Sequence, residues 1–166
     1  MNNLIREATS NDLDAVWNLW KEIQKQEVFF AYQANYPRQQ IEDSWINLNN
    51  HIYVYDFKGQ VQGAYLMKPN QPGHGKHIVN AAYLVDNKVR GKGIGRILCK
   101  HSLEVATKLG YRGMQFNLVV STNVGAISIW KSFGFKIIGT IPGGFHHVEK
   151  GYIDAYIFFK DLTLTT

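Results

Sequence analysis

The residues of this chain best suited to chemistry form a basic, glycine-rich turn near its middle. Glycines and basic side chains alternate there in the order Arg90, Gly91, Lys92, Gly93, Ile94, Gly95, Arg96. The glycines let the backbone come close to a ligand and adopt positive φ angles. Successive backbone N–H groups at the start of a helix attract phosphate groups, and the basic side chains add positive charge. We therefore expect a phosphate site, although a turn that merely caps the next helix would look similar.

Two common phosphate-binding motifs do not describe this turn. A P-loop ends in Gly-Lys followed by Ser or Thr, and the turn has no such ending. A dinucleotide-binding fingerprint reads Gly-x-Gly-x-x-Gly, and Gly95 follows Gly93 too closely to be its third glycine. The turn alone is therefore weak evidence for any one ligand.

Polar side chains that could act on a substrate are few. Asn80 and Asn117 are amides in otherwise apolar stretches. Buried amides need hydrogen-bond partners, so each is either satisfied in the core or orients a substrate, and we favour orientation for Asn117. No Asp or Glu interrupts these stretches, so a proton would leave through water or through another group. The candidate groups are His77, His146, His147, Glu149 and Asp154.

Other reactive residue types indicate structure rather than chemistry. His146 and His147 are adjacent and far from the single cysteine, Cys99, which makes a poor ligand set, so no metal site is expected. Cys99 has no base beside it in sequence and is interpreted as structural. The aromatic residues Phe29, Phe30, Tyr32 and Tyr36 could form an acceptor wall, but core packing is the favoured interpretation.

Alternating elements surround the turn and must position it. Strands are predicted at residues 4–8, 51–57, 61–68, 77–85, 113–120, 136–141 and 152–160. Helices are predicted from Thr9 or Ser10 to about Gln26, over 38–48, from about Gly93 to Leu109, and over 123–133. Residues 142–147 are predicted to be a loop. This order indicates an α+β fold with a mixed sheet, and the run 77–85, apolar on both faces, is expected at its centre.

Two segments together resemble the GNAT superfamily of acetyl-CoA-dependent N-acetyltransferases. The run from Arg90 to Gly95 is similar to the family signature Arg/Gln-x-x-Gly-x-Gly/Ala, which follows a central strand. Downstream, the family's Asn-x-x-Ala, aromatic residue and Gly-Phe have counterparts in Asn123, Ala126, Trp130, Gly134 and Phe135. Order and spacing agree, and the resemblance covers nearly the whole chain.

The resemblance implies a central, mixed and mostly antiparallel sheet flanked by four helices and splayed between strands 77–85 and 113–120. Acetyl-CoA would enter that gap. The implied cofactor-binding residues are Tyr83, Leu84, Val85, Arg90, Gly91, Lys92, Gly93, Ile94, Gly95, Arg96, Asn123 and Trp130. Backbone groups of residues 83–85 would meet the pantetheine arm and the acetyl carbonyl, and the turn would hold the diphosphate.

Trp130 departs from the family pattern. Many relatives carry a tyrosine there, whose phenol protonates the leaving thiolate, whereas tryptophan offers only a weak N–H donor. A thiol with a pKa near about 8.5 can leave with little help. For catalysis we expect Asn117 to orient the substrate, a backbone N–H near Leu84 or Val85 to stabilise the oxyanion, and His146 to be a candidate base.

The implied activity is transfer of the acetyl group to a primary or secondary amine of a small molecule, by direct attack in a ternary complex. Residues 139–156 resemble a subgroup that acetylates amino acids and their toxic analogues, so an amino-acid-like acceptor is expected, with the 142–151 loop lining its site. Two alternatives stay open: a peptide or protein N-acetyltransferase, and a non-catalytic acetyl-CoA sensor. The acceptor's identity, the base and the oligomeric state, a homodimer included, are left open.

Composition bounds these expectations. With 166 residues, 45% of them hydrophobic and 19% charged, one domain spanning residues 1–166 is expected. No apolar run approaches the roughly 20 residues that span a membrane. The net charge of +5 includes a basic cluster at residues 88–100 that CoA phosphates would explain. No basic helix or stacking platform indicates nucleic-acid binding, and the single cysteine favours a cytoplasmic location.

Overall fold

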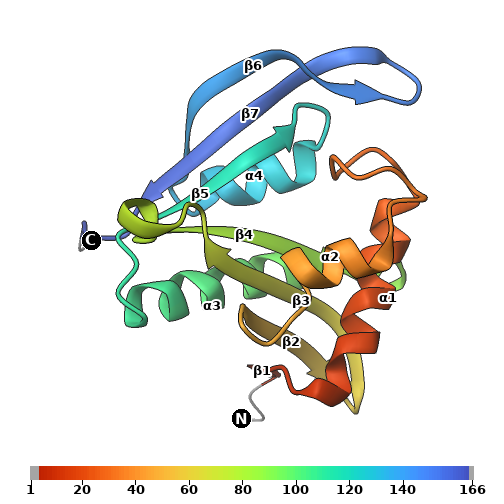
Figure 1. Cartoon of the computed structure of the whole chain (residues 1–166), viewed down its shortest axis with the longest axis vertical. Coiled ribbons are helices and arrows are strands. Elements are labelled where there is room, and N and C mark those ends of the chain that lie inside the picture. The colour runs from red at the N-terminus through yellow and green to blue at the C-terminus, as the bar shows by residue number, and fades with distance from the viewer. Residues whose placement is uncertain (1–3, 165–166) are drawn as a thin grey trace.

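A computed structural model describes residues 4–164, which build one seven-stranded sheet in the order β1-β2-β3-β4-β5-β7-β6 (Figure 1). The strands are β1 Ile5–Glu7, β2 His51–Phe57, β3 Gln60–Pro69, β4 Ile78–Val85, β5 Gly113–Val120, β6 Lys136–His147 and β7 Gly151–Asp161. The helices are α1 Leu13–Gln24, α2 Arg38–Ser44, α3 Ile94–Lys108 and α4 Val124–Ser132. Every neighbouring pair is antiparallel except β4 and β5. The predicted α+β fold, with four helices around a mostly antiparallel sheet, is confirmed.

The helices cover the two faces of the sheet separately. Apolar residues of α1 and α2 pack with one face in a core that includes Trp20, Ile41 and Leu84. Residues of α3 and α4 pack with the opposite face around Tyr65, Leu98 and Trp130. Because side chains alternate along a strand, β4 contributes to both cores, and its predicted central place in the sheet is confirmed.

The start of α1 differs from the simple cap predicted from the sequence. A short 3-10 turn, Ser10–Asp12, precedes the helix. The Asp12 carboxylate accepts bonds from the amide and hydroxyl of Thr9 at 2.7 and 2.9 Å and forms an ion pair with Arg6. That ion pair and these hydrogen bonds hold the pKa of Asp12 well below its usual range. Thr9 is the N-cap of this turn, as predicted, and Asp12 completes a capping box with it.

The second helix is shorter than the predicted 38–48. It ends at Ser44 because asparagine side chains take the carbonyls that a further turn would need. The amide of Asn47 donates to the carbonyl of Glu42 at 2.9 Å, and that of Asn50 donates to the carbonyl of Trp45 at 2.9 Å.

The prediction of a loop at residues 142–147 is wrong. These residues continue β6, and the register with β7 shifts between Ile141 and Phe145. Gly143 takes a φ of 60° in this bulge, and its amide donates to the Asp154 carboxylate at 3.0 Å. Pro142 is tolerated because β6 is an edge strand, where a missing N–H leaves no ladder partner unpaired.

Candidate active site

The site begins where β4 and β5 separate. The two strands pair only from Ile78 to Asn80, opposite Gly113 to Gln115. Beyond that point β5 keeps its pairing with β7 through a register shift between Phe116 and Val119. The splay predicted between the two central strands is therefore confirmed, and it leaves β4 with one open side.

The register of β3 and β4 decides which backbone groups face the gap. Asn70 donates to the carbonyl of Ile78, and Asp86 donates to that of Gln62, at 2.8 and 2.9 Å. Because antiparallel pairs alternate between bonded and non-bonded, the even-numbered residues of β4, Leu84 among them, direct their backbone groups at β3. The backbone groups of Ala81, Tyr83 and Val85 face the gap instead. The expectation that the Leu84 N–H serves the site is wrong on this geometry.

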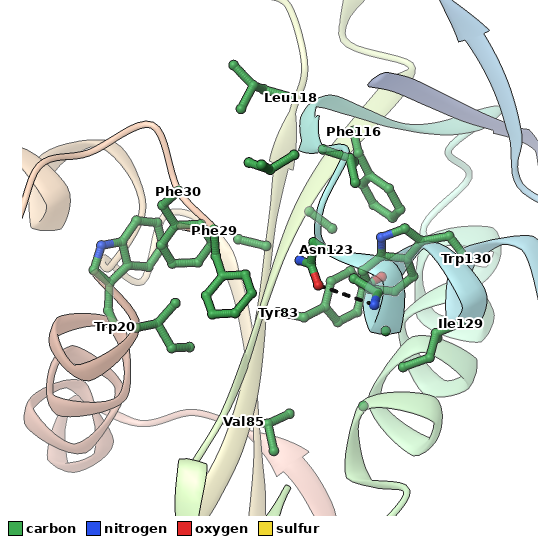
Figure 2. Close-up of a pocket in the computed structure, with 18 of the residues that line it drawn as sticks. Trp20, Phe29, Phe30, Tyr83, Val85, Phe116, Leu118, Asn123, Ile129 and Trp130 are labelled. Atoms are coloured by element: carbon green, nitrogen blue, oxygen red, sulfur yellow. Dashed lines mark hydrogen bonds between the residues drawn. The ribbon is translucent and has the colours of Figure 1, made fainter. Parts of the chain in front are cut away.

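A cavity of about 720 Å³ occupies the gap. The glycine-rich turn forms one end and the aromatic residues of the α1–α2 connection form the other. Figure 2 shows Phe29 and Phe30 on one side of the cavity, facing Tyr83 and Trp130 on the other. The cavity thus joins the predicted phosphate turn to the segment that the sequence favoured as plain core.

The backbone of the turn fits a diphosphate. Gly91 and Gly93 have φ values of 81° and 79°, and a Cβ on either would meet nothing within 4 Å, so open space lies above both. Gly93 is the N-cap of α3, and Gly93, Ile94 and Gly95 all line the cavity. Within residues 4–164, the amides of Gly91, Gly93, Ile94 and Gly95 have no hydrogen-bond acceptor. Free amides at the positive end of a 15-residue helix are what phosphate oxygens require.

The basic side chains of the turn reach different neighbours. The guanidinium of Arg90 lies 5.2 Å from the ring centroid of Phe29, at the aromatic end. Arg96 donates to the Ser132 hydroxyl at 2.9 Å and lies over Phe133. Arg90 and Arg96 line the cavity, whereas Lys92 is exposed and does not.

Asn123, the N-cap of α4, and Trp130 within α4 both line the cavity. Asn123 caps the helix, because its carbonyl oxygen accepts from the Ala126 amide at 3.4 Å. Trp130 packs against Tyr83 and Phe116 at centroid distances of 4.7 and 4.8 Å. Its indole N–H has no acceptor within the described chain, and none of the described side-chain nitrogens is both fully buried and unpaired. That N–H is therefore accessible from the cavity.

Tyr83 presents its ring, not its hydroxyl, to the site. The hydroxyl bonds the Ser102 hydroxyl at 2.7 Å and lies against Met114. Burial raises the pKa of Tyr83 well above its usual value, so it is no proton donor. Burial likewise raises the pKa of Cys99 to about 12, which leaves that thiol unreactive.

The two asparagines on the cavity floor differ in their partners. Asn117 accepts from Gln115 at 3.0 Å and donates to Asn70 at 2.7 Å. The side chain of Asn80 has no hydrogen-bond partner among residues 4–164. Sequence reasoning favoured Asn117 as the orienting group, but Asn80 has the free amide.

None of the predicted bases lines the cavity. His146 is exposed and stacks on Tyr152 at 4.7 Å, while His147 accepts from the Glu149 amide at 3.1 Å. Asp154 is engaged by Gly143, and the 142–151 segment predicted to line the acceptor site does not do so. In the described part of the chain no carboxylate or imidazole lines the cavity.

The aromatic end contains residues that the sequence did not single out for the site. Trp20 of α1 and Trp45, just after α2, back the half-buried Phe30 and Tyr32. Trp20 stacks on Phe30 at 4.7 Å and is itself fully buried. The apolar stripe of α1 signalled Trp20 as core, but no sequence signal links Trp45 to the cavity.

Comparison with known proteins agrees with this geometry. Residues 13–135 match the model of the acetyltransferase (GNAT) family, and the chain belongs to that family. It is similar to the N-acetyltransferase aca1 of Schizosaccharomyces pombe, with 40% identity over 104 residues, 62% of this chain and 50% of that protein. The chain thus spans about half the length of that relative.

Solved structures show the same fold over nearly the whole chain. A GCN5-related N-acetyltransferase from Kribbella flavida shares 34% identity with a TM-score of 0.88, covering 95% of this chain and 96% of that one. A phosphinothricin acetyltransferase from Sinorhizobium meliloti, in complex with AcCoA, has a TM-score of 0.82 at 19% identity, covering 97% and 89%. Enzymes of this family use acetyl-CoA as acyl donor.

Two further observations concern membranes and metal ions. None of the described helices is long and apolar enough to cross a membrane. Within residues 4–164, no three His, Cys, Asp or Glu side chains gather where they could hold a metal ion.

Proposed function

We propose that this chain transfers the acetyl group of acetyl-CoA to an amine of a small molecule, by direct attack within a ternary complex. The observation that carries the proposal is the cavity between β4 and β5, with a turn of free amides at one end. Acetyl-CoA supplies an acetyl thioester, and the residues of this chain bind, orient and polarise it.

The proposed cofactor site follows the free backbone groups. The amides of Gly91, Gly93, Ile94 and Gly95 bind the diphosphate, with charge from Arg90, Lys92 and Arg96. The backbone of Tyr83 and Val85 pairs with the pantetheine arm in place of the missing strand. The Asn123 side chain, which lines the cavity, contacts the same arm.

The proposed oxyanion donor is a backbone N–H of β4 that faces the gap. Because the backbone of Leu84 is directed at β3, the proposal assigns this role to Val85 or Tyr83. A fixed amide stabilises developing charge better than solvent does, since it need not reorient.

The leaving group needs little protonation. The Trp130 N–H, which is accessible from the cavity, can donate a hydrogen bond to the sulfur but cannot give up its proton. A thiol pKa near about 8.5 makes the thiolate a competent leaving group without an acid. The proton of the attacking amine leaves through water, because no carboxylate or imidazole of the described residues lines the cavity.

An amino-acid-like acceptor is the finer part of the proposal. It rests on the resemblance of residues 139–156 to acetyltransferases of amino acids and their analogues. A peptide or protein acceptor is the second candidate, and a non-catalytic acetyl-CoA sensor is the third. The same proposal includes a cytoplasmic location and a single domain formed by residues 1–166.

A homodimer is also proposed. Exposed apolar side chains occur at both ends of the β6–β7 hairpin, where Ile138, Val148 and Tyr152 are more than half exposed. Sedimentation equilibrium tests this part: a monomer at all concentrations would contradict it.

The experiment that tests the activity is release of CoA thiol from acetyl-CoA, screened over amino acids, amino-acid analogues, polyamines and peptides. Turnover of an amino-acid-like amine supports the proposal. Tight binding of acetyl-CoA without release on any acceptor supports the sensor instead.

A further inference from the structure

The aromatic end of the cavity, which we call the aromatic compartment, consists of Trp20, Phe29, Phe30, Tyr32 and Trp45. Its rings touch one another: Trp20 lies 5.7 Å from Tyr32 and 5.9 Å from Trp45. Phe29, Phe30 and Tyr32 are half-buried, so their free surface faces the cavity or its mouth. The compartment is continuous with the gap in which the thioester is proposed to lie.

The polar atoms of this compartment are used within the protein. The Trp45 N–H donates to the Tyr32 hydroxyl at 3.1 Å, and the Trp20 N–H donates to Gln24 at 3.0 Å. Gln24 is buried, and its amide donates in turn to the carbonyl of Gln33 at 2.8 Å. What remains for a ligand is the O–H of Tyr32 and, over most of the compartment, ring faces and edges, which bind apolar groups.

The charged groups around the compartment are cations. The Lys68 ammonium of β3 lies 4.2 Å from the Trp45 ring centroid, and Arg90 lies over Phe29. The acidic residue of the connecting segment, Glu27, accepts from the Ala34 amide and does not line the cavity. The polar side chains that β4 and β5 contribute to the same cavity are the neutral amides of Asn80 and Asn117.

We infer that the aromatic compartment binds an apolar body attached to the acceptor amine, and that by stripping water from the ammonium group it makes the neutral amine available without a side-chain base. This inference rests on the proposed acetyl transfer. It identifies the acceptor class as monoamines with an apolar body and excludes polycations, for which no described carboxylate lines the site.

The chemistry balances with no further reactant. The ammonium loses one proton to water on entering the compartment. The nitrogen lone pair then forms the C–N bond at the thioester carbonyl, and the C–S bond breaks with its electron pair on sulfur. The amide nitrogen gives its second proton to water, and the thiolate is protonated in solution.

Physical reasons for this loss of a proton are present in the site. Desolvation and nearby positive charge both disfavour an ammonium ion and lower its pKa. Lys68 illustrates the effect, because burial beside Trp45 lowers the pKa of its own ammonium group. A cation–π contact opposes this by about 0.5–2 kcal/mol. Full burial can shift a pKa by about three units or more, which at about 1.4 kcal/mol per unit is the larger effect.

The test compares leucine and phenylalanine with glycine and 1,4-diaminobutane as acceptors. We expect kcat/KM for the two apolar amino acids to exceed that for glycine by about tenfold or more, from the apolar area buried. Phe30→Ala should collapse this ratio and leave the KM for acetyl-CoA unchanged. Phe57→Ala is the matched control, since Phe57 is exposed on β2, away from the cavity. If the alanine variant is unstable, Phe30→Leu removes the ring while it keeps an apolar side chain and most of the volume.

A pH series separates amine desolvation from a side-chain base. The pH dependence of kcat reports groups in the bound complex. We expect its inflection to lie below the free amine's pKa and to move with the acceptor when two amines of different pKa are compared. An inflection that is the same for both acceptors would identify a protein base and overturn the inference.

The outcomes keep the two proposals apart. If glycine and the diamine are acetylated as well as leucine, acetyl transfer stands and the compartment's role is wrong. If acetyl-CoA binds and no amine releases CoA, the activity itself is wrong.

Discussion

The guanidinium of Arg90 lies 5.2 Å from the ring centroid of Phe29 and so connects the phosphate turn to the aromatic compartment. Arg90 belongs to the proposed diphosphate site and Phe29 to the aromatic compartment, so the two parts of the cavity adjoin at this contact. One contact therefore spans the two halves that must be filled together for transfer to occur.

This contact predicts coupling between the two ligands. Phe29→Leu and Arg90→Gln should each raise KM for both acetyl-CoA and acceptor. A cation–π pair contributes about 0.5–1 kcal/mol at a partly exposed site. The loss of binding free energy in the double variant should therefore be smaller, by that amount, than the sum of the losses in the two single variants. Steady-state kinetics of the unchanged protein, the two single variants and the double variant measure this coupling energy. Strictly additive effects would show that the phosphate turn and the aromatic compartment bind their ligands independently.

The turn's glycines predict a selective loss. Gly91→Ala should raise the KM for acetyl-CoA about tenfold or more, because a residue with a Cβ resists the left-handed backbone, by roughly 1–2 kcal/mol, that presents the amides. Gly59→Ala is the control, since Gly59 has the same φ of 81° and equally open space but lies in the β2–β3 hairpin. Both should lose similar stability by urea unfolding, and equal KM values would contradict the phosphate role.

Because the side-chain amide of Asn80 is unpaired, we expect its substitution to change the acceptor KM more than substitution of Asn117 does. Asn80→Ala should raise the acceptor KM about five- to thirtyfold, the equivalent of one buried hydrogen bond of about 1–2 kcal/mol. Asn117→Ala should act more weakly, because its amide is already bonded to Gln115 and Asn70. Asn49→Ala, on an exposed turn, controls for the loss of an amide. A reversed order for Asn80 and Asn117 would restore Asn117 as the orienting residue.

Two substitutions of Trp130 should have different effects on kcat. Trp130→Phe removes the N–H that faces the cavity and should lower kcat about three- to tenfold, as expected for one neutral donor. Trp130→Tyr should keep kcat or raise it, since a phenol can donate a proton. Trp17→Phe, another buried tryptophan on α1, is the matched control. Identical kcat values for all three would mean that the leaving group needs no contact at this position.

The resemblance to the GNAT family implied the splayed sheet, because its two motifs lie in the elements on either side of the gap. Sequence patterns could not predict which backbone groups of β4 face it, since a shift of one residue in the register with β3 exchanges Leu84 for Val85. They also read Pro142-Gly143-Gly144 as a loop, because proline and glycine are typical of turns, whereas an edge strand accommodates both in a bulge.

The aromatic compartment could be predicted from the sequence only in part. Phe29 and Tyr32 were interpreted from the sequence as core, with an acceptor wall as the alternative, and in the structure they pack against a core and line the cavity. Trp45 reaches them through a hydrogen bond to Tyr32 across 13 residues of chain. Such a contact depends on how the irregular segment between α1 and α2 folds back, which no periodicity encodes.

The open side of β4 has a consequence for the survival of the protein in a cell. A sheet with a missing partner along its central strand is completed only by a bound molecule, so the ligand acts as part of the fold. Binding at a hundred times Kd adds about 2.7 kcal/mol to the free energy of unfolding. Abundance and resistance to proteolysis would then follow the supply of acetyl-CoA, and the protein would persist best when acyl donor is plentiful.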